Sequence, residues 1–111
     1  MADLKEIGKQ AKAARYILAG LDTDTKNKAL FTAAECLEAD AADILAENAK
    51  DLEAGRSRCM PEGLLDRLSL TQKRISDMAE GLRQVAALPD PVGEILDTFT
   101  RPNGLIISKR R

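Results

Sequence analysis

The hydrophobic positions near the start of the chain recur at the spacing of one face of a helix. Asp3 and Glu6 have the form of an N-cap and its capping-box partner, and Gly20 is a residue type that often ends a helix. We therefore expect a first helix over residues 4–19. Its apolar positions follow at intervals of three and four residues: Leu4, Ile7, Ala11, Ala14 and Leu18. The other face, which we expect to be solvated, carries Lys5, Lys9, Lys12 and Arg15.

A second helical segment, one long helix or a helix pair, is predicted from Asp22 to Gly55. Asp22 begins a run of three capping residue types, and nearly all later residues are helix formers. Asn48 with Asp51 can cap a fresh turn, so the sequence leaves open whether the helix breaks near Asn48. One stripe, expected to be a packing face, contains Leu30, Ala34, Leu37, Ala41, Ile44 and Asn48. The residues expected to stay in water are Glu35, Glu38, Glu47 and Lys50.

Two further helices are predicted between a loop and a proline-rich stop. Residues 55–63 contain Gly, Ser and Pro and are expected to form the loop, which a short apolar helix over residues 64–68 follows. Thr71 can cap the next helix, whose apolar positions are Ile75, Met78, Leu82 and Val85. That helix should end before Pro89 and Pro91, because proline cannot donate the helical hydrogen bond.

The pattern changes to that of a β-hairpin after Gly93. Apolar and polar residues alternate weakly from Ile95 to Arg101, which is typical of a strand. Pro102-Asn103-Gly104 supplies turn residues that tolerate positive φ, and residues 105–108 are β-branched enough to return as a second strand. The unpaired edge of such a hairpin favours pairing with another chain, so we expect a homo-oligomer formed through this arm.

The pattern as a whole predicts a mainly α fold. We expect a helical layer of about four helices over residues 1–92 and a truncated β-hairpin over residues 93–111. The chain has 111 residues, enough for one small core and too few for a cofactor domain together with a substrate domain.

Composition and charge exclude several classes of partner. The apolar runs are too short to cross a bilayer, and the N-terminus lacks the features of a secretory signal, so we expect no membrane partner and a cytoplasmic location. Lys and Arg number 17 and Asp and Glu 18, for a net charge of -1, which argues against nucleic-acid binding.

The sequence contains no recognisable catalytic, cofactor-binding or metal-ligating set. Histidine is absent, and no glycine-rich phosphate-binding motif occurs. Cys36 is expected to be a small buried hydrophobe beside the helical stripe. Cys59 lies in the expected loop near Arg56 and Arg58, whose charges favour a thiolate, but no base accompanies it. We therefore predict no catalytic residue, no bound cofactor and no metal for this chain.

Four segments carry a resemblance to a known family. In order they are Asn48 to Leu52, Leu64 to Thr71, Gly81 to Gly93 and Arg101 to Leu105, the last two including Leu-Pro-Asp-Pro-Val-Gly and Arg-Pro-Asn-Gly-Leu. In order and spacing they resemble the N-terminal portion of gamma-glutamyl phosphate reductase, also called glutamate-5-semialdehyde dehydrogenase, in the aldehyde dehydrogenase superfamily.

The resemblance implies an α/β enzyme that is several times longer than this chain. Such oxidoreductases use NADPH to reduce L-glutamyl 5-phosphate to glutamate 5-semialdehyde in the biosynthesis of the amino acid proline, through a cysteine nucleophile. By resemblance, the nucleophile and cofactor site lie beyond residue 111, so we expect a catalytically inert fragment that supplies scaffold. The alternative is a stand-alone helical interaction module derived from that family.

Overall fold

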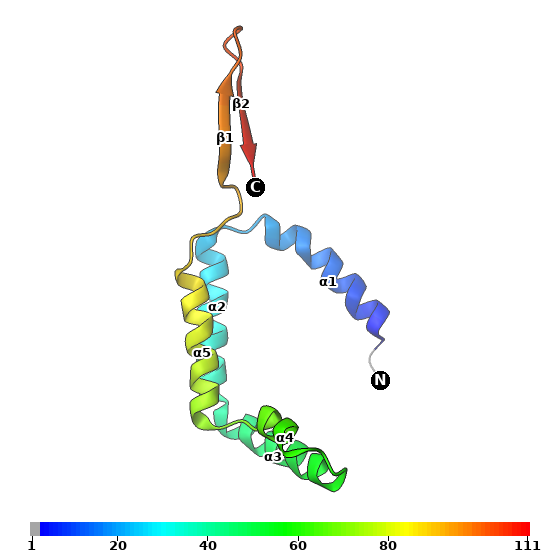
Figure 1. The fold of residues 1–111 in the computed structure, drawn as a ribbon. Coiled ribbons are helices and arrows are strands. Elements are labelled where there is room, and N and C mark those ends of the chain that lie inside the picture. The colour runs from blue at the N-terminus through cyan, green and yellow to red at the C-terminus, as the bar shows by residue number, and fades with distance from the viewer. Residues whose placement is uncertain (1–2) are drawn as a thin grey trace. The chain divides into compact units, whose positions relative to one another are not determined.

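The computed structural model describes residues 3–111 as five helices followed by an antiparallel two-stranded hairpin (Figure 1). The elements in chain order are α1 (Leu4–Ala19), α2 (Thr23–Ala39), α3 (Ala41–Ser57), α4 (Glu62–Leu68), α5 (Gln72–Ala87), β1 (Ile95–Thr100) and β2 (Ile106–Arg110). The predicted mainly α fold with a terminal hairpin is confirmed. None of the helices in this part of the chain is both long and apolar enough to cross a membrane.

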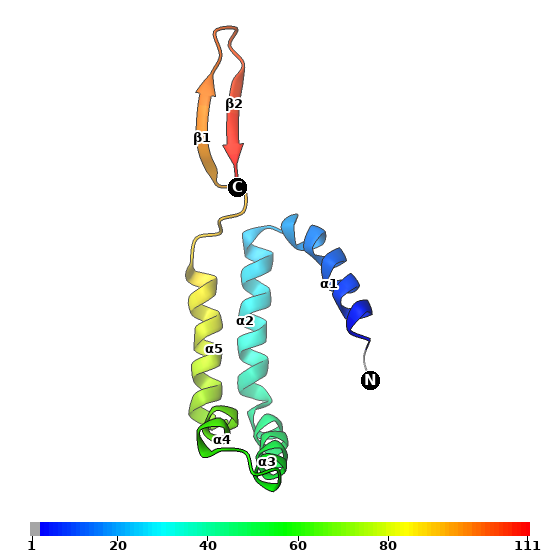
Figure 2. The ribbon, with the colours of Figure 1, turned by 45° about the vertical axis from the view of Figure 1, so that its right-hand side comes forward.

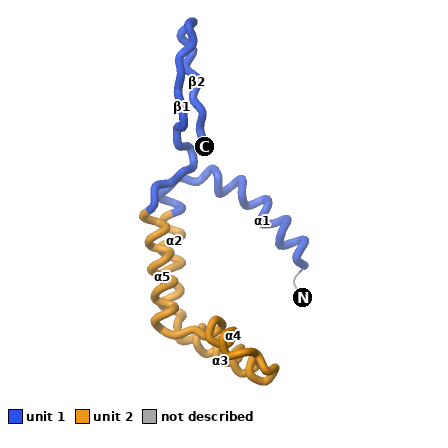
Figure 3. Tube along the Cα trace, in the orientation of Figure 1, with its two compact units in different colours: residues 1–26, 88–111 blue, residues 27–87 orange. Residues whose placement is uncertain are grey.

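The chain divides into two compact units (Figure 3). We call residues 27–87 the helical unit, and residues 1–26 with residues 88–111 the arm unit. The helical unit contains most of α2 with α3, α4 and α5, whereas the arm unit contains α1, the first turn of α2 and the hairpin.

Helix α1 has the predicted bounds but not the full predicted cap. The Asp3 side chain accepts a hydrogen bond from the backbone N–H of Lys5 at 2.9 Å, as an N-cap does. Glu6 does not complete a capping box, because its carboxylate accepts from Gln10 one turn along the helix. No residue of α1 is buried, and the apolar side chain of Leu4 is 81% exposed.

The predicted long helix is a pair that breaks at Asp40 and not near Asn48. Residues 41–57 form one continuous helix with Asn48 inside it, so there are five helices where about four were expected. Figures 1 and 2 show that α3 leaves α2 in a different direction at this junction. At the junction Asp40 has a φ of -92° and a ψ of 9°, and Ala41, the first residue of α3, packs with only 3% of its surface exposed. A contact of this kind is not visible in local helix propensity.

Small side chains form most of the core of the helical unit. Ile75 is the one large side chain that is fully buried, and Ala34 and Ala79 are also 0% exposed. The predicted stripe is confirmed in a modified form: Ala34, Ala41 and Asn48 are buried, whereas the larger Leu30, Leu37 and Ile44 are half-buried. Close helix packing therefore depends on the small members of the stripe.

The connection between α3 and α4 is shorter than the predicted loop. Gly55 is buried in the last turns of α3, and α4 begins at Glu62, two residues before the predicted start. A methyl group on Gly55 would lie 3.1 Å from Cδ2 of Leu65 and 3.3 Å from Sδ of Met60. The glycine thus serves close packing of α4 on α3, and it does not begin a loop.

The hairpin has the predicted turn and a bulge that the alternation did not predict. Phe99 pairs with Ile107 and Thr100 with Ile106, while the register shifts between Ile95 and Asp97. Gly104 takes a φ of +86°, as the predicted turn requires. All six residues of β1 are exposed, so neither face of this strand is covered.

Candidate functional site

The two cysteines of the chain, one on α2 and one just after α3, are surface residues. Cys36 and Cys59 are both free and exposed. The expectation that Cys36 is buried is therefore wrong, because its position on α2 faces away from the Ala34 stripe. Cys59 lies between α3 and α4, within the predicted loop, and has a φ of 56°. No group of three or more His, Cys, Asp or Glu side chains within residues 3–111 could hold a metal ion.

A shallow hollow of about 390 Å³ lies beside α3 and the segment before α5. Its rim and floor are formed by Asp43, Ile44, Glu47, Asn48, Asp51 and Leu70. Exposed carboxylates at such helical spacing are ordinary surface residues. The one buried polar side chain of the lining, Asn48, already has partners for its amide nitrogen and oxygen. The hollow therefore offers a ligand no unused buried group.

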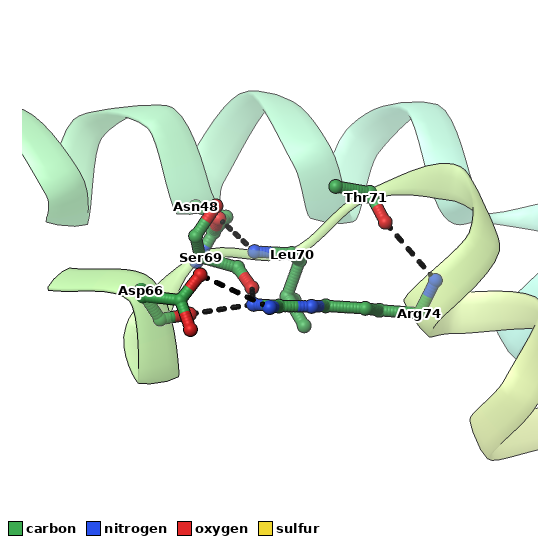
Figure 4. Close-up of polar contacts among 6 residues, drawn as sticks. All are labelled: Asn48, Asp66, Ser69, Leu70, Thr71 and Arg74. Atoms are coloured by element: carbon green, nitrogen blue, oxygen red, sulfur yellow. Dashed lines mark hydrogen bonds and ion pairs between the residues drawn. The ribbon is translucent and has the colours of Figure 1, made fainter. Parts of the chain in front are cut away.

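A network of hydrogen bonds in the helical unit forms the Asn48 corner, which we define as Asn48, Asp66, Ser69, Leu70, Thr71 and Arg74 (Figure 4). Asn48 Nδ2 donates to the carbonyl of Leu68 at 2.9 Å, and its Oδ1 accepts from the N–H of Leu70 at 2.8 Å. One amide thus satisfies a donor and an acceptor of the chain between α4 and α5. Buried backbone groups need such partners.

Arg74 holds the same corner from the α5 side. Its Nη1 donates to the carbonyls of Asp66 at 2.5 Å and Ser69 at 2.6 Å, and its Nη2 donates to Oδ1 of Asp66 at 3.1 Å. Thr71 caps α5 as predicted, since its Oγ1 accepts from the backbone N–H of Arg74 at 3.1 Å. The guanidinium therefore joins the end of α4 to the start of α5, which is a structural role.

The buried hydrogen-bonding role of Asn48 was not predicted from the sequence, although a signal was present. Asn48 follows Ala34 and Ala41 at intervals of seven residues, on a stripe expected to be packed. A polar residue in such a stripe indicates a specific buried hydrogen bond. The interpretation as a possible helix break used its capping propensity alone.

An ion pair between Glu38 and Arg83 joins α2 to α5 within the helical unit. The two guanidinium nitrogens of Arg83 donate to the two carboxylate oxygens of Glu38 at 3.2 and 2.6 Å. This bond lowers the pKa of Glu38 and raises that of Arg83. Glu38 was expected to stay in water, but its side chain is only 37% exposed because it bonds to Arg83.

A second carboxylate, Asp90, is held by three donors in the arm unit. Its Oδ2 accepts from Thr23 Oγ1 at 2.8 Å and pairs with Lys26, and its Oδ1 accepts from the N–H of Val92 at 3.0 Å. These bonds lower the pKa of Asp90 to about 2, and the bond from Lys26 has the largest effect. Asp90 is therefore ionised at neutral pH and fully used in binding its own chain.

The comparisons with known proteins point to a single kind of enzyme. No family model matches the chain. Gamma-glutamyl phosphate reductase from Syntrophomonas wolfei is 53% identical over 108 residues, which cover 97% of this chain and 26% of that protein. The reductase from Neisseria meningitidis serogroup A is 59% identical over 101 residues, 91% of this chain and 24% of that protein.

The fold agrees with the sequence comparison. The crystal structure of gamma-glutamyl phosphate reductase from Thermotoga maritima matches with a TM-score of 0.91 and 39% identity, covering 96% of this chain and 26% of that chain. This chain thus spans about a quarter of the length of the relatives that it matches. The predicted resemblance is confirmed: the chain is homologous, in sequence and in fold, to a portion of gamma-glutamyl phosphate reductase.

Proposed function

We propose that this chain is a scaffold portion of an NADPH-dependent oxidoreductase that reduces L-glutamyl 5-phosphate to glutamate 5-semialdehyde in proline biosynthesis. The observation that carries the proposal is homology to a quarter of gamma-glutamyl phosphate reductase at 53% identity. By the same homology, NADPH and the small-molecule substrate bind the whole enzyme and not this portion alone.

The polar chemistry of the described residues supports a scaffold role. The side chains of Asn48, Arg74 and Asp90 form hydrogen bonds with backbone groups in the connections that follow helices α4 and α5. Reduction of an acyl phosphate through a thioester needs a reactive thiolate and a positioned nicotinamide. Neither Cys36 nor Cys59 lines the hollow beside Asn48 or the one beside Arg56, and both are exposed.

Uncovered apolar surface supports a role in assembly. Ile17 is 70% exposed and Ile106 is 66% exposed, on α1 and β2 respectively. An exposed two-stranded sheet can add strands from another chain. We infer that the hairpin associates with a second copy and that the remainder of the enzyme covers the helices. The same hairpin would also suit a stand-alone interaction module, which is the competing proposal.

Ligand binding and turnover by the isolated chain test the inert-scaffold proposal. Calorimetric titration with NADPH should show no saturable heat, and the chain should not consume NADPH in the presence of L-glutamyl 5-phosphate. A full-length reductase under the same conditions is the positive control. Stoichiometric NADPH binding by the 111 residues would overturn the proposal.

Complementation separates a scaffold portion from a stand-alone module. The Syntrophomonas wolfei reductase without the segment that matches this chain should be inactive, and co-expression with this chain should restore reductase activity if the chain is a scaffold portion. Failure to restore activity, together with stable folding of the chain alone, would favour the module. The reading frame after Arg111 gives an independent answer.

A further inference from the structure

The connection between α5 and the hairpin is fixed to the first turn of α2 through one carboxylate. Asp90 lies between two prolines, Pro89 and Pro91, and its side chain is 16% exposed. Thr23 and Lys26, which are three residues apart and so lie on the same face of the helix, both donate to it. Asp22, just before this turn, accepts from the N–H of Thr25 at 2.8 Å and so caps the helix start.

The bonding continues without a gap from Asp90 into the hairpin. The N–H of Val92 donates to Asp90, and the N–H of Glu94 donates to the carbonyl of Pro91 at 3.2 Å. The N–H of Gly93 donates to the carbonyl of Arg111 at 3.0 Å, and the N–H of Arg111 donates to the carbonyl of Glu94 at 3.0 Å. Proline fixes φ at position 91, so residues 90–94 are restrained by this ring and by the hydrogen bonds.

We propose that Asp90 is a positioning residue that sets the direction in which the hairpin leaves the first turn of α2 within the arm unit, so that association of two copies through the hairpin depends on this carboxylate. The second half of this proposal rests on the association through the hairpin proposed above. A three-donor carboxylate suits the role, because charge-assisted hydrogen bonds are shorter and stronger than neutral ones. Its ionisation persists at neutral pH because its pKa is about 2.

Spin-label distances test the positioning directly. One label is placed on Thr25→Cys in the first turn of α2 and one on Thr100→Cys at the end of β1, both within the arm unit, with Cys36→Ser and Cys59→Ser to remove the native thiols. Labelled chain is diluted into unlabelled chain, so that only distances within one copy are measured. We expect one narrow distance distribution for the reference protein.

Three variants and two controls give the expected contrast. Asp90→Asn, Lys26→Met and Thr23→Val each remove part of the bonding and should broaden the distribution, Asp90→Asn most. Lys26→Arg keeps the ion pair and should preserve the narrow distribution. Asp24→Asn makes the same chemical change as Asp90→Asn, but at a residue in the first turn of α2 that does not bond to Asp90. This variant should also preserve the narrow distribution. Circular dichroism verifies that each variant is folded.

The spin-label distances test the role of Asp90, and sedimentation tests association through the hairpin, so the two proposals can fail separately. A distribution for Asp90→Asn as narrow as the reference would overturn the positioning role, and so would equal broadening by Asp24→Asn. Sedimentation of the unlabelled variants tests the second half: association should weaken with Asp90→Asn and not with Asp24→Asn. If the reference chain remains monomeric, the association proposal fails while the spin-label result still decides the role of Asp90. Broadening without weaker association would overturn the dependence.

Discussion

The helical unit and the arm unit are stabilised in different ways. In the helical unit Ile75, Ala34 and Ala79 are fully buried. The Asn48 corner provides hydrogen-bond partners for the backbone between α4 and α5. In the described part of the arm unit no residue is buried, and local hydrogen bonds with the Asp90 contacts hold it. Buried contacts therefore determine the fold of the first unit, whereas the second depends on local hydrogen bonds and leaves most of its large apolar side chains exposed.

The largest expected effect of a substitution comes from the core of the helical unit. Ile75→Ala removes the one large fully buried side chain and should lower the free energy of unfolding by about 2–5 kcal/mol. Ile106→Ala in the arm unit, at a side chain that is 66% exposed, should change it by less than about 0.5 kcal/mol. Chemical denaturation of both variants measures the contrast, and equal losses would contradict the difference between the units.

The Asn48 corner should give the next largest effect. Asn48→Leu keeps similar size but leaves the carbonyl of Leu68 and the N–H of Leu70 without this partner, which should cost about 1–3 kcal/mol. Asn48→Asp retains the acceptor for Leu70 and loses only the donor to Leu68. A loss for Asn48→Leu no larger than for a surface substitution would show that water replaces the amide. Denaturation at neutral pH measures both variants.

Two glycines of the helical unit should respond in opposite ways. Gly81 in α5 has open space where a Cβ would lie, so Gly81→Ala should raise the free energy of unfolding by about 0.5–1 kcal/mol. Gly55→Ala brings the same gain in helix propensity, but its Cβ would lie 3.1 Å from Leu65, so the gain should be cancelled or reversed. The difference in melting temperature between the two variants checks this, and an equal rise for both would contradict the close packing at Gly55.

A charged residue on the hairpin should affect association and leave stability unchanged. Ile106→Lys should leave the free energy of unfolding within about 0.5 kcal/mol of the reference, because the side chain is exposed. It should reduce self-association, since a lysine on an edge strand opposes pairing with another strand. Sedimentation velocity across a concentration series provides the measurement. Unchanged association would place the interface elsewhere.

Acid should weaken the Asp90 contacts in a defined window. Because the folded pKa is lowered to about 2 from an unfolded value of 3.8, the stabilisation is fully present above the unfolded value and is lost as pH falls through the folded one. The effect therefore lies between about pH 4 and pH 2. The carboxyl chemical shift of Asp90 should titrate with a midpoint near the lower limit, and Lys26→Met should raise that midpoint. A midpoint of 3.8 in the reference chain would contradict the geometry.

Much of the local structure followed from the sequence. The bounds of α1, the cap at Thr71, the proline stop after α5 and the turn at Gly104 are determined by residues within a few positions of each other. The pattern did not predict the break at Asp40, because both sides of it are good helix formers. The exposure of Cys36 was also mispredicted, since burial depends on which face of the helix meets a neighbour.

The sequence by itself determined which elements form and which kind of enzyme the chain resembles. Tertiary structure decided the pairs that join the elements: Asn48 with the backbone of residues 68 and 70, Glu38 with Arg83, and Thr23 and Lys26 with Asp90. Partners separated by 20 to 67 residues leave no local pattern, because each is also an ordinary surface residue type. Only the meeting of the helices and turns in space makes them partners.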